Sequence, residues 1–193
     1  MPSPKILVIP GSLRARSHNA RLAAWAIKEL TLIDVETTRI ALEDYAMPLY
    51  DPEEEIKSGP PQNAIKLKQM MTAHQGILIV TPEHNASIPS VLKNAIDWVS
   101  RVRERGDPPF AAFRDRVFAI ASASSEAQGG LHGLAALRTI LQLGCGAIVI
   151  PEQVAVPEAS VSFDDMDNPL PSAAANALRV ELARLVDMAR MVA

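Results

Sequence analysis

The chain alternates between short apolar runs and longer segments in which apolar residues recur every three or four positions. A short apolar run between turn residues is typical of a buried strand, and the longer spacing is typical of a helix with one buried face. This alternation predicts a parallel sheet with helices on both faces. Strands are expected at residues 5–10, 33–40, 76–81, 116–122 and 146–150.

The segments between these strands carry the helical period. The second strand is more polar than the others and is expected near an edge of the sheet. A stretch rich in proline, glycine and acidic residues, 47–62, is expected to be a loop. Nothing divides the chain into parts, so we expect one α/β domain over residues 1–193. Helices are expected at residues 19–30, 63–74, 90–102, 130–143 and 172–191.

Composition and charge limit the partners that this chain can have. Of its 193 residues 48% are apolar, and the formal net charge is −3 with no cluster of basic residues, which argues against a nucleic-acid partner. Its apolar runs are shorter than the roughly 18 residues of a membrane span, and residues 6–9 are too few for a signal-peptide core. We therefore expect a cytoplasmic protein without a membrane partner. The one cysteine, Cys145, is expected to be an unreactive packed thiol.

The first strand is followed by a turn with the composition of a phosphate site. Gly11 permits a tight backbone, and Ser12 and Arg14 supply donors just before the N–H groups of a helix N-terminus. The alternative is an ordinary helix cap, which explains Ser17 alone. The common GxxxxGK[ST] and GxGxxG phosphate loops are absent from the sequence. The residues that we expect to contact the phosphate are Ser12, Arg14, Ser17 and Asn19.

The third strand is followed by "TPEHNASIPSVLKNAIDWVSR", residues 81–101, whose first part contains two prolines. Such a stiff loop suits a surface that presents backbone groups to the edge of a flat heterocycle. A third loop, "SASSEAQGG" at residues 122–130, follows the fourth strand. In a doubly wound sheet, ligands bind at the carboxyl ends of the strands, which is where all three loops are expected.

The first two motifs together resemble the NADPH-dependent FMN reductase family, which is flavodoxin-like and includes chromate, quinone and azo reductases. The family patterns are G-S-x-R-x-x-S-x-N and P-E-Y-N-x-S-x-P-x-x-L-K-N-A-I-D-W, and both occur here in order, with His84 in place of the tyrosine. The resemblance covers nearly the whole chain. It implies a five-stranded sheet in the order 2-1-3-4-5, FMN as the cofactor, and NADPH or NADH as co-substrate.

The resemblance also assigns residues to the cofactor. It places the four residues of the first loop on the FMN phosphate, and it places the second and third loops around the isoalloxazine ring. His84 and Glu126 depart from the family pattern, and both affect the expected substrate preference. His84 either points into solvent or borders the flavin, where an imidazole would change charge near pH 6.5. The residues expected around the ring are Pro82, Glu83, His84, Asn85, Ser87, Ser122 and Ser124, with Gly129 and Gly130.

The function implied is electron transfer from NAD(P)H through FMN to quinones, chromate, azo compounds or free flavin, by a ping-pong mechanism. The cofactor carries the hydride chemistry, so we assign no catalytic acid or base. One alternative is an FMN-binding electron carrier without turnover of its own, although carriers of this fold are usually more acidic. The other is an anion-binding regulatory domain without flavin. His18, His74 and His132 are too scattered in sequence to indicate a metal site.

Two further segments leave alternatives open. The helix at residues 90–102 is either a core helix or, as the resemblance implies, part of the interface of a homodimer or homotetramer with Trp98 as an anchor. The run "RVRERGD", residues 101–107, is either a solvated surface or a funnel for an anionic substrate. The acidic run 51–55 lacks the glycine and spacing of a calcium loop.

Overall fold

The computed structural model describes residues 3–14, 16–164, 167–168, 170 and 172–192. All strand pairings in the sheet are parallel, in the order β2-β1-β3-β4-β5, with a sixth strand that also pairs with β4. The doubly wound fold and the strand order expected from the sequence are therefore confirmed. The strands are β1 Lys5–Pro10, β2 Glu36–Arg39, β3 Gly76–Val80, β4 Val117–Ala123, β5 Ile148–Val149 and β6 Val154–Val156.

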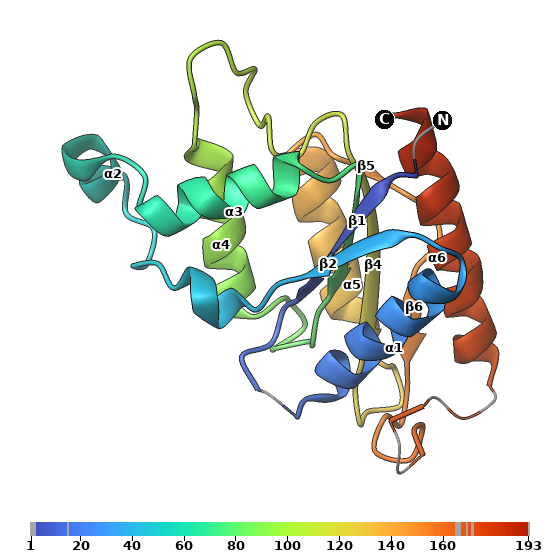
Figure 1. The fold of residues 1–193 in the computed structure, drawn as a ribbon. Helices are drawn as coiled ribbons and strands as arrows, with labels where there is room; N and C mark the ends of the chain where they lie inside the picture. The colour runs from blue at the N-terminus through green and yellow to red at the C-terminus, as the bar shows by residue number, and fades with distance from the viewer. Residues whose placement is uncertain (1–2, 15, 165–166, 169, 171, 193) are drawn as a thin grey trace.

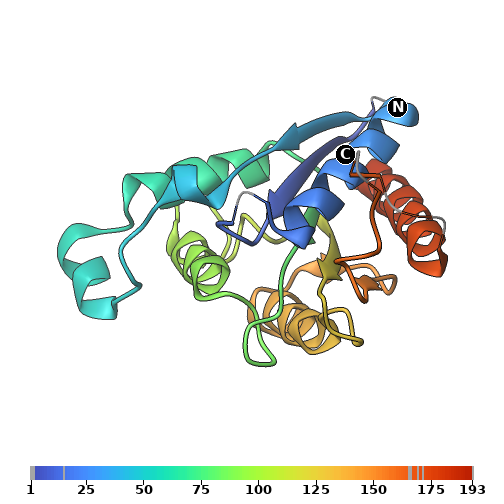
Figure 2. The same cartoon turned by 90° about the horizontal axis from the view of Figure 1, so that it is seen from below.

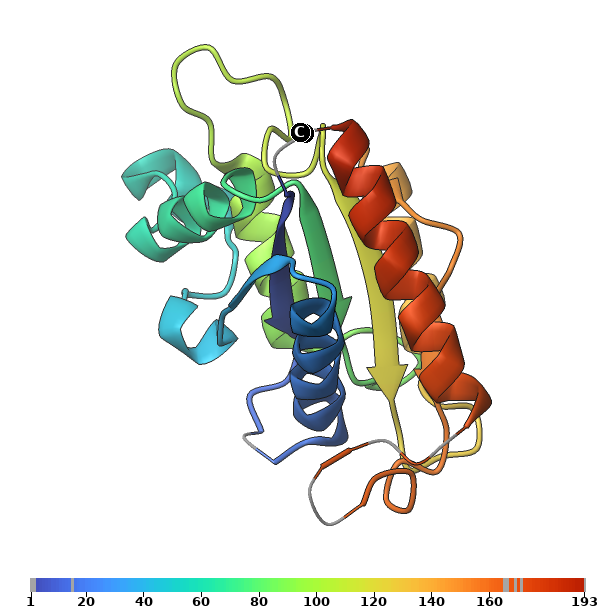
Figure 3. The ribbon, with the colours of Figure 1, turned by 45° about the vertical axis from the view of Figure 1, so that its right-hand side comes forward.

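Helices cover both faces of this sheet (Figures 1 and 3). Side chains alternate along β1, so that Ile6 and Val8 pack with α1 and α6, whereas Leu7 and Ile9 pack with α3, α4 and α5. Strands β1, β3 and β4 are almost entirely buried, which explains their continuous apolar sequences. The helices are α1 His18–Leu32, α2 Pro52–Ser58, α3 Gln62–Thr72, α4 Ser90–Arg101, α5 Leu131–Thr139 and α6 Ala173–Met191, with a 3₁₀ turn Leu42–Tyr45 and a π turn Ile140–Gly144.

The expectation of a loop over residues 47–62 is wrong, because this segment contains helix α2. Asp51 caps the helix by accepting a hydrogen bond from the N–H of Glu53 (2.9 Å), and Pro52 occupies the first turn. Glutamates in the same turn complement the helix dipole. The helix buries none of its residues, so it has no apolar period that could reveal it. It projects away from the rest of the fold (Figure 2).

The expected fifth strand is shorter than predicted and is followed by β6, a strand that the sequence pattern does not predict. Between β5 and β6 the chain leaves the sheet, so that β4 pairs with β5 at one end and with β6 at the other. From α6, the carboxylate of Glu181 accepts a hydrogen bond from the N–H of Ile120 (3.1 Å) in this gap. From α5, Arg138 donates to the carbonyl of Ile150 (2.8 Å) and to Gln153 (3.0 Å). These two side chains hold the divided edge together.

Helix α4 packs its apolar stripe into the core of its own chain, and Trp98 is buried there and is not exposed as an interface anchor. The Trp98 side chain is fully buried, and its indole N–H donates to the carbonyl of Pro48 (2.8 Å). Its ring meets Tyr50 edge-on, with the centroids 5.0 Å apart. Trp98 therefore fixes the base of the segment that carries α2, within the same chain.

The run of charges at residues 101–107 is not a substrate funnel at the predicted site. It follows α4 and precedes β4, so it lies at the amino ends of the strands, opposite the loops that were expected to bind the ligand (Figure 1). Lys68, which is buried on α3, pairs there with Asp107 and Glu104. These ion pairs fasten the loop to the helix.

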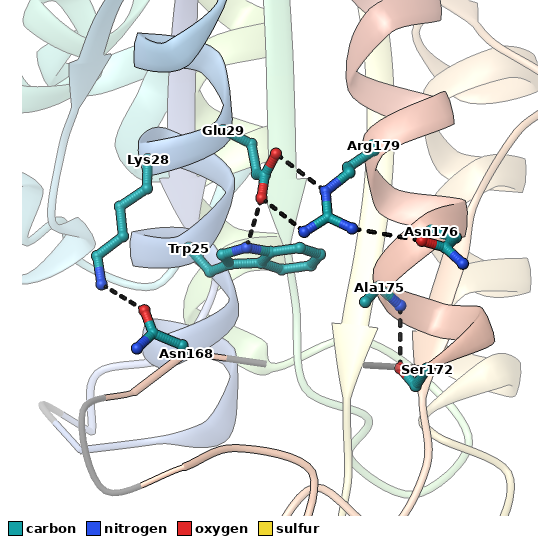
Figure 4. A network of polar contacts seen from close by, with 8 residues as sticks. All are labelled: Trp25, Lys28, Glu29, Asn168, Ser172, Ala175, Asn176 and Arg179. Carbon is teal, nitrogen blue, oxygen red and sulfur yellow. Dashed lines mark hydrogen bonds and ion pairs between the residues drawn. The ribbon is translucent and has the colours of Figure 1, made fainter. Parts of the chain in front are cut away.

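Helices α1 and α6 are joined by a polar network on their outer side (Figure 4). The indole N–H of Trp25 donates to Glu29 (3.0 Å), and Arg179 of α6 binds both oxygens of the same carboxylate at 3.1 Å. Lys28 donates to Asn168 (3.1 Å). The network fixes α1, whose N-terminus forms part of the predicted phosphate site.

Candidate functional site

The loops after β1, β3 and β4 lie at the same end of the sheet, where the three parallel strands end (Figure 1, lower part). The N–H of Gly11 donates to the carbonyl of Val80 (2.8 Å), and the N–H of Thr81 donates to Ala121 (2.9 Å). A Cβ added to Gly11 would lie 3.0 Å from the side chain of Thr81. The first two loops are therefore packed directly against each other.

The first loop leads into the N-terminus of α1. Ser17 is the N-cap, and its hydroxyl accepts a hydrogen bond from the N–H of Ala20 (3.0 Å). The hydroxyl of Ser12 accepts from the N–H of Arg14 (3.1 Å), while the Arg14 side chain is exposed. The first backbone hydrogen bond of the helix runs from the N–H of Arg21 to the carbonyl of Ser17 (3.1 Å). The N–H groups of His18 and Asn19 come before this bond, so they have no acceptor within the helix. The turn thus gathers backbone donors, hydroxyls and a guanidinium around one helix end.

Asn19 joins this helix end to the third loop. Its side-chain amide donates to the carbonyl of Ala123 (2.8 Å) and accepts from the N–H of the same residue (2.9 Å). Beside it, the Nε2 atom of His18 lies 3.3 Å from the hydroxyl of Ser125. Since the oxygen of Asn19 and one of its two N–H donors already bond Ala123, its main observed role is to position α1 against the end of β4.

The second loop contains a tight turn over residues 84–87. The N–H of His84 donates to the carbonyl of Ser87 (2.8 Å), and the N–H of Ser87 donates back to His84 (3.0 Å). The two residues between them, Asn85 and Ala86, have φ values of 51° and 59°. Asparagine tolerates this left-handed conformation, whereas alanine adopts it at a cost of about 1 kcal/mol. Each residue of the turn is exposed, so the turn projects its backbone outward as a rigid unit.

Glu83 anchors the same loop to α5. Its carboxylate accepts a hydrogen bond from the N–H of Gly133 (3.0 Å) in the first turn of the helix, and its other oxygen lies 3.3 Å from Nδ1 of His132. A Cβ added to Gly133 would lie 3.2 Å from Cα and Cβ of Glu83. Glu83 is therefore directed toward the N-terminus of α5.

The third loop is held closed by Ser122. Its side chain is fully buried and donates to the carbonyl of Gly129 (2.6 Å). Gly130 follows with φ of 88°, and a Cβ there would lie 2.9 Å from the Ser122 hydroxyl, so glycine is required on both counts. The hydroxyl of Ser124 accepts from the N–H of Glu126 (3.2 Å), and Glu126 is exposed at the rim.

Comparison with known proteins identifies the family of this chain. Residues 4–161 match the family model of NADPH-dependent FMN reductases, which is well over half of the chain. The chain belongs to this family. As an FMN reductase it has FMN as its cofactor and NAD(P)H as its reductant, and it is an oxidoreductase.

Two curated relatives and one solved structure agree with this. A 2-hydroxy-1,4-benzoquinone reductase of a Burkholderia species is 39% identical over 140 residues, which cover 71% of this chain and 73% of that protein. An NAD(P)H-dependent FMN reductase of Pseudomonas aeruginosa is 32% identical over 183 residues, covering 94% and 92%. The flavoenzyme NAD(P)H:(acceptor) oxidoreductase FerB of Paracoccus denitrificans shares the fold, with a TM-score of 0.77, 23% identity and coverage of 97% and 98%.

The first loop of this FMN reductase is chemically suited to a phosphate dianion. A small cavity of about 40 Å³ is lined by Ser12, Arg14 and Arg39 among others. Nearby, the buried Nδ1 atom of His18 has no hydrogen-bond partner in the described part of the chain. Burial, with smaller contributions from Arg21 and Arg14, holds the pKa of His18 below its usual value. This orphaned ring nitrogen lies beside the helix N-terminus, and together with the donors of the first loop the residues present fit the phosphate of FMN.

The structure brings the eleven predicted residues to one end of the sheet but gives them different surroundings. Ser12 and Arg14 remain available at the first loop, and the turn from His84 to Ser87 is exposed. The side chains of Asn19, Glu83 and Ser122 instead bond other parts of the chain. The sequence motifs do not predict the partners of these three side chains. Two of the pairs join residues that are 104 and 50 positions apart, whereas Ser122 and Gly129 belong to the same loop.

Proposed function

We propose that this protein oxidises NADPH or NADH and passes the electrons, through FMN, to a quinone. The observation that carries the proposal is the convergence of three loops around the N-terminus of α1, where backbone donors, Ser12 and Arg14 meet. The family match gives the cofactor and reductant, and the curated relatives include a benzoquinone reductase. Bound FMN supplies the electron transfer, and the protein supplies its position and surroundings.

Each loop has a distinct part in this proposal. Ser12, Arg14, Ser17 and the N–H groups of α1 hold the phosphate, while Asn19 keeps α1 in register with β4. Pro82, Asn85 and Ser87, with the backbone of the tight turn, border the flavin ring on one side. Ser124 and the backbone near Gly130 border it on the other. Because reductant and acceptor use the same open surface in turn, the kinetics are expected to be ping-pong.

The acceptor range extends in our proposal to chromate, azo compounds and free flavin. His84 sits on the exposed turn and is proposed to face the acceptor, where a histidine side chain that carries a proton attracts anions. Turnover with an anionic acceptor is then more sensitive to pH than turnover with a neutral quinone, and His84→Tyr reduces the difference. Identical pH profiles of kcat/KM in parent and variant would remove His84 from the site.

We also propose that the protein acts in the cytoplasm as one domain, assembled as a homodimer or homotetramer. No helix in the described ranges is both long and apolar enough to cross a bilayer. For assembly, support comes from Leu49 and Ile56, whose side chains are 81% and 82% exposed on the projecting segment around α2. Light scattering at micromolar concentration tests this, and a monomer would contradict it.

The test of the proposed activity uses purified protein, FMN, NADPH and benzoquinone. The expected result is a yellow complex that, under anaerobic conditions, oxidises one equivalent of NADPH per bound FMN by itself and oxidises NADPH continuously only when the quinone is present. A complex that binds FMN but does not turn over would indicate an electron carrier. Protein that stays colourless after incubation with FMN would indicate an anion-binding domain and would refute the proposal.

A further inference from the structure

A second, larger cavity lies beside the phosphate loop. Its volume is about 670 Å³, within the range of small-molecule sites. It is formed by α1, the carboxyl end of β2 and the segment that follows β6. It shares Ala20 and Arg39 with the small cavity next to Ser12 and Arg14, so the two cavities adjoin. The sequence motifs give no role to this region.

Three arginines line this cavity, and one of them is already neutralised. The Nε atom of Arg21 lies 2.6 Å from a carboxylate oxygen of Asp167, and its terminal nitrogen donates to the carbonyl of Asp164 (3.1 Å). The guanidinium lies over the ring of Phe163, 4.6 Å from the centroid. Arg21 and Phe163 therefore form a fixed wall and do not leave a free charge.

Arg16 and Arg39 are the two cavity arginines that form no ion pair within the described part of the chain. Both side chains are exposed, and within the described ranges the ion pairs include neither of them. The second carboxylate of the wall, Asp164, accepts hydrogen bonds from the backbone and side chain of Asn168 (2.8 and 3.2 Å). Two guanidinium groups that line the same open cavity favour a dianionic group, above all a phosphate, which accepts paired hydrogen bonds from arginine.

We propose that this cavity binds the 2′-phosphate of the adenosine half of NADPH, through Arg16 and Arg39, and so makes the enzyme prefer NADPH to NADH. The inference rests on the proposed function. A dinucleotide is longer than FMN, so if its nicotinamide met the flavin ring and it lay along the FMN, its adenosine end would reach past the phosphate loop. The adjoining cavity with unpaired arginines is where that end would find a complementary charge.

The sharpest test compares adenosine 2′,5′-bisphosphate with adenosine 5′-monophosphate, which differ only in the 2′-phosphate. Calorimetric titration of the FMN-loaded protein should show at least tenfold tighter binding of the bisphosphate. A charge-assisted hydrogen bond contributes about 1.5–3 kcal/mol, so Arg39→Ala and Arg16→Ala should each weaken bisphosphate binding by roughly 10- to 100-fold. In turnover, kcat/KM for NADPH should fall by a similar factor relative to that for NADH.

Arg105→Ala is the matched control, because it removes the same charge from an exposed arginine at the opposite end of the sheet. Equal affinity of the parent for the two nucleotides, or unchanged bisphosphate binding in both cavity variants, would overturn the inference. Weaker FMN binding, with the nucleotide ratio unchanged, would assign the arginines to the FMN phosphate instead. If the parent protein turned over neither NADPH nor NADH, the proposed function would be refuted. The calorimetric comparison of the two nucleotides would still test the cavity.

Discussion

Replacing Asn19 by alanine separates a structural role from direct contact with the cofactor. The side chain is 2% exposed and bonds both the N–H and the carbonyl of Ala123. Removing it leaves two buried backbone groups without these partners, each at a cost of about 1–3 kcal/mol. The FMN-free protein should therefore lose about 2–6 kcal/mol of unfolding free energy.

The expected shift in melting temperature follows from the size of the chain. For proteins of 150–250 residues, 1 kcal/mol corresponds to roughly 2–4 °C, so a loss of about 3 kcal/mol lowers Tm by roughly 6–12 °C. The assay is thermal unfolding of the FMN-free protein, followed by circular dichroism. Ser17→Ala, which removes only the helix cap of α1, serves as the control and should cost about 1 kcal/mol.

The result that would refute this reasoning is specific. If the Asn19→Ala variant without FMN melts within about 1 °C of the parent while its FMN affinity falls at least tenfold, Asn19 contacts the phosphate and does not act through Ala123. If both stability and FMN affinity fall, the bonds to Ala123 are what position the phosphate loop.

Three further predictions concern stability and reactivity. Burial raises the pKa of Glu181 to about 8 from an ordinary value of 4.5, so its contribution to stability is complete below pH 4.5 and is lost as the pH rises to 8. The loss of unfolding free energy from this group amounts to about 5 kcal/mol at most. Urea unfolding at pH 5 and pH 8 should show a decline in the parent that is absent from Glu181→Gln. An equal decline in parent and variant would contradict the assignment. Gly130→Ala should lower the unfolding free energy by about 2–3 kcal/mol, because the added Cβ clashes with Ser122 and the backbone is also strained. The control Gly106→Ala, at φ of 95° with open space around it, should lower it by about 1 kcal/mol. Equal losses of unfolding free energy in the two variants would contradict the clash. Burial raises the pKa of Cys145 from 9.0 to about 11, so iodoacetamide at pH 8 should label the folded protein about a hundredfold more slowly than an ordinary thiol; rapid labelling would contradict this.

The sheet was predictable because β1, β3 and β4 are buried on both faces and appear as continuous apolar runs. Helix α2 was not predictable from periodicity, since it buries no residue, although Asp51 and Pro52 at its start are capping signals. Strand β6 has only three residues and follows a segment with Pro151, so it lacked a strand pattern of its own.

Trp98 shows a second limit on what the sequence pattern predicts. An apolar stripe on a helix predicts that the stripe is buried but does not tell whether the partner lies in the same chain. Here the partners are Pro48 and Tyr50, which precede Trp98 by about fifty residues.

The position of the site followed from the order of the two motifs, but its internal contacts did not. The bonds that organise it join Asn19 to Ala123 and Glu83 to Gly133, across 104 and 50 positions of the sequence. Such pairings depend on which strands are neighbours and on where the helices begin, and single-sequence patterns do not encode them. The assignment of individual residues to FMN stays a prediction for the same reason.

The central claim is that the loop from Gly11 to Asn19 holds the phosphate of FMN. The most direct measurement is a fluorescence titration of FMN-free protein with FMN and with riboflavin, which lacks the phosphate, in the parent and in Arg14→Ala. The account predicts that the variant binds FMN roughly 10- to 100-fold more weakly than the parent, while riboflavin binding changes little, because one charge-assisted contact contributes about 1.5–3 kcal/mol. Equal FMN affinity in the two proteins, or an equal loss for FMN and riboflavin, would contradict it.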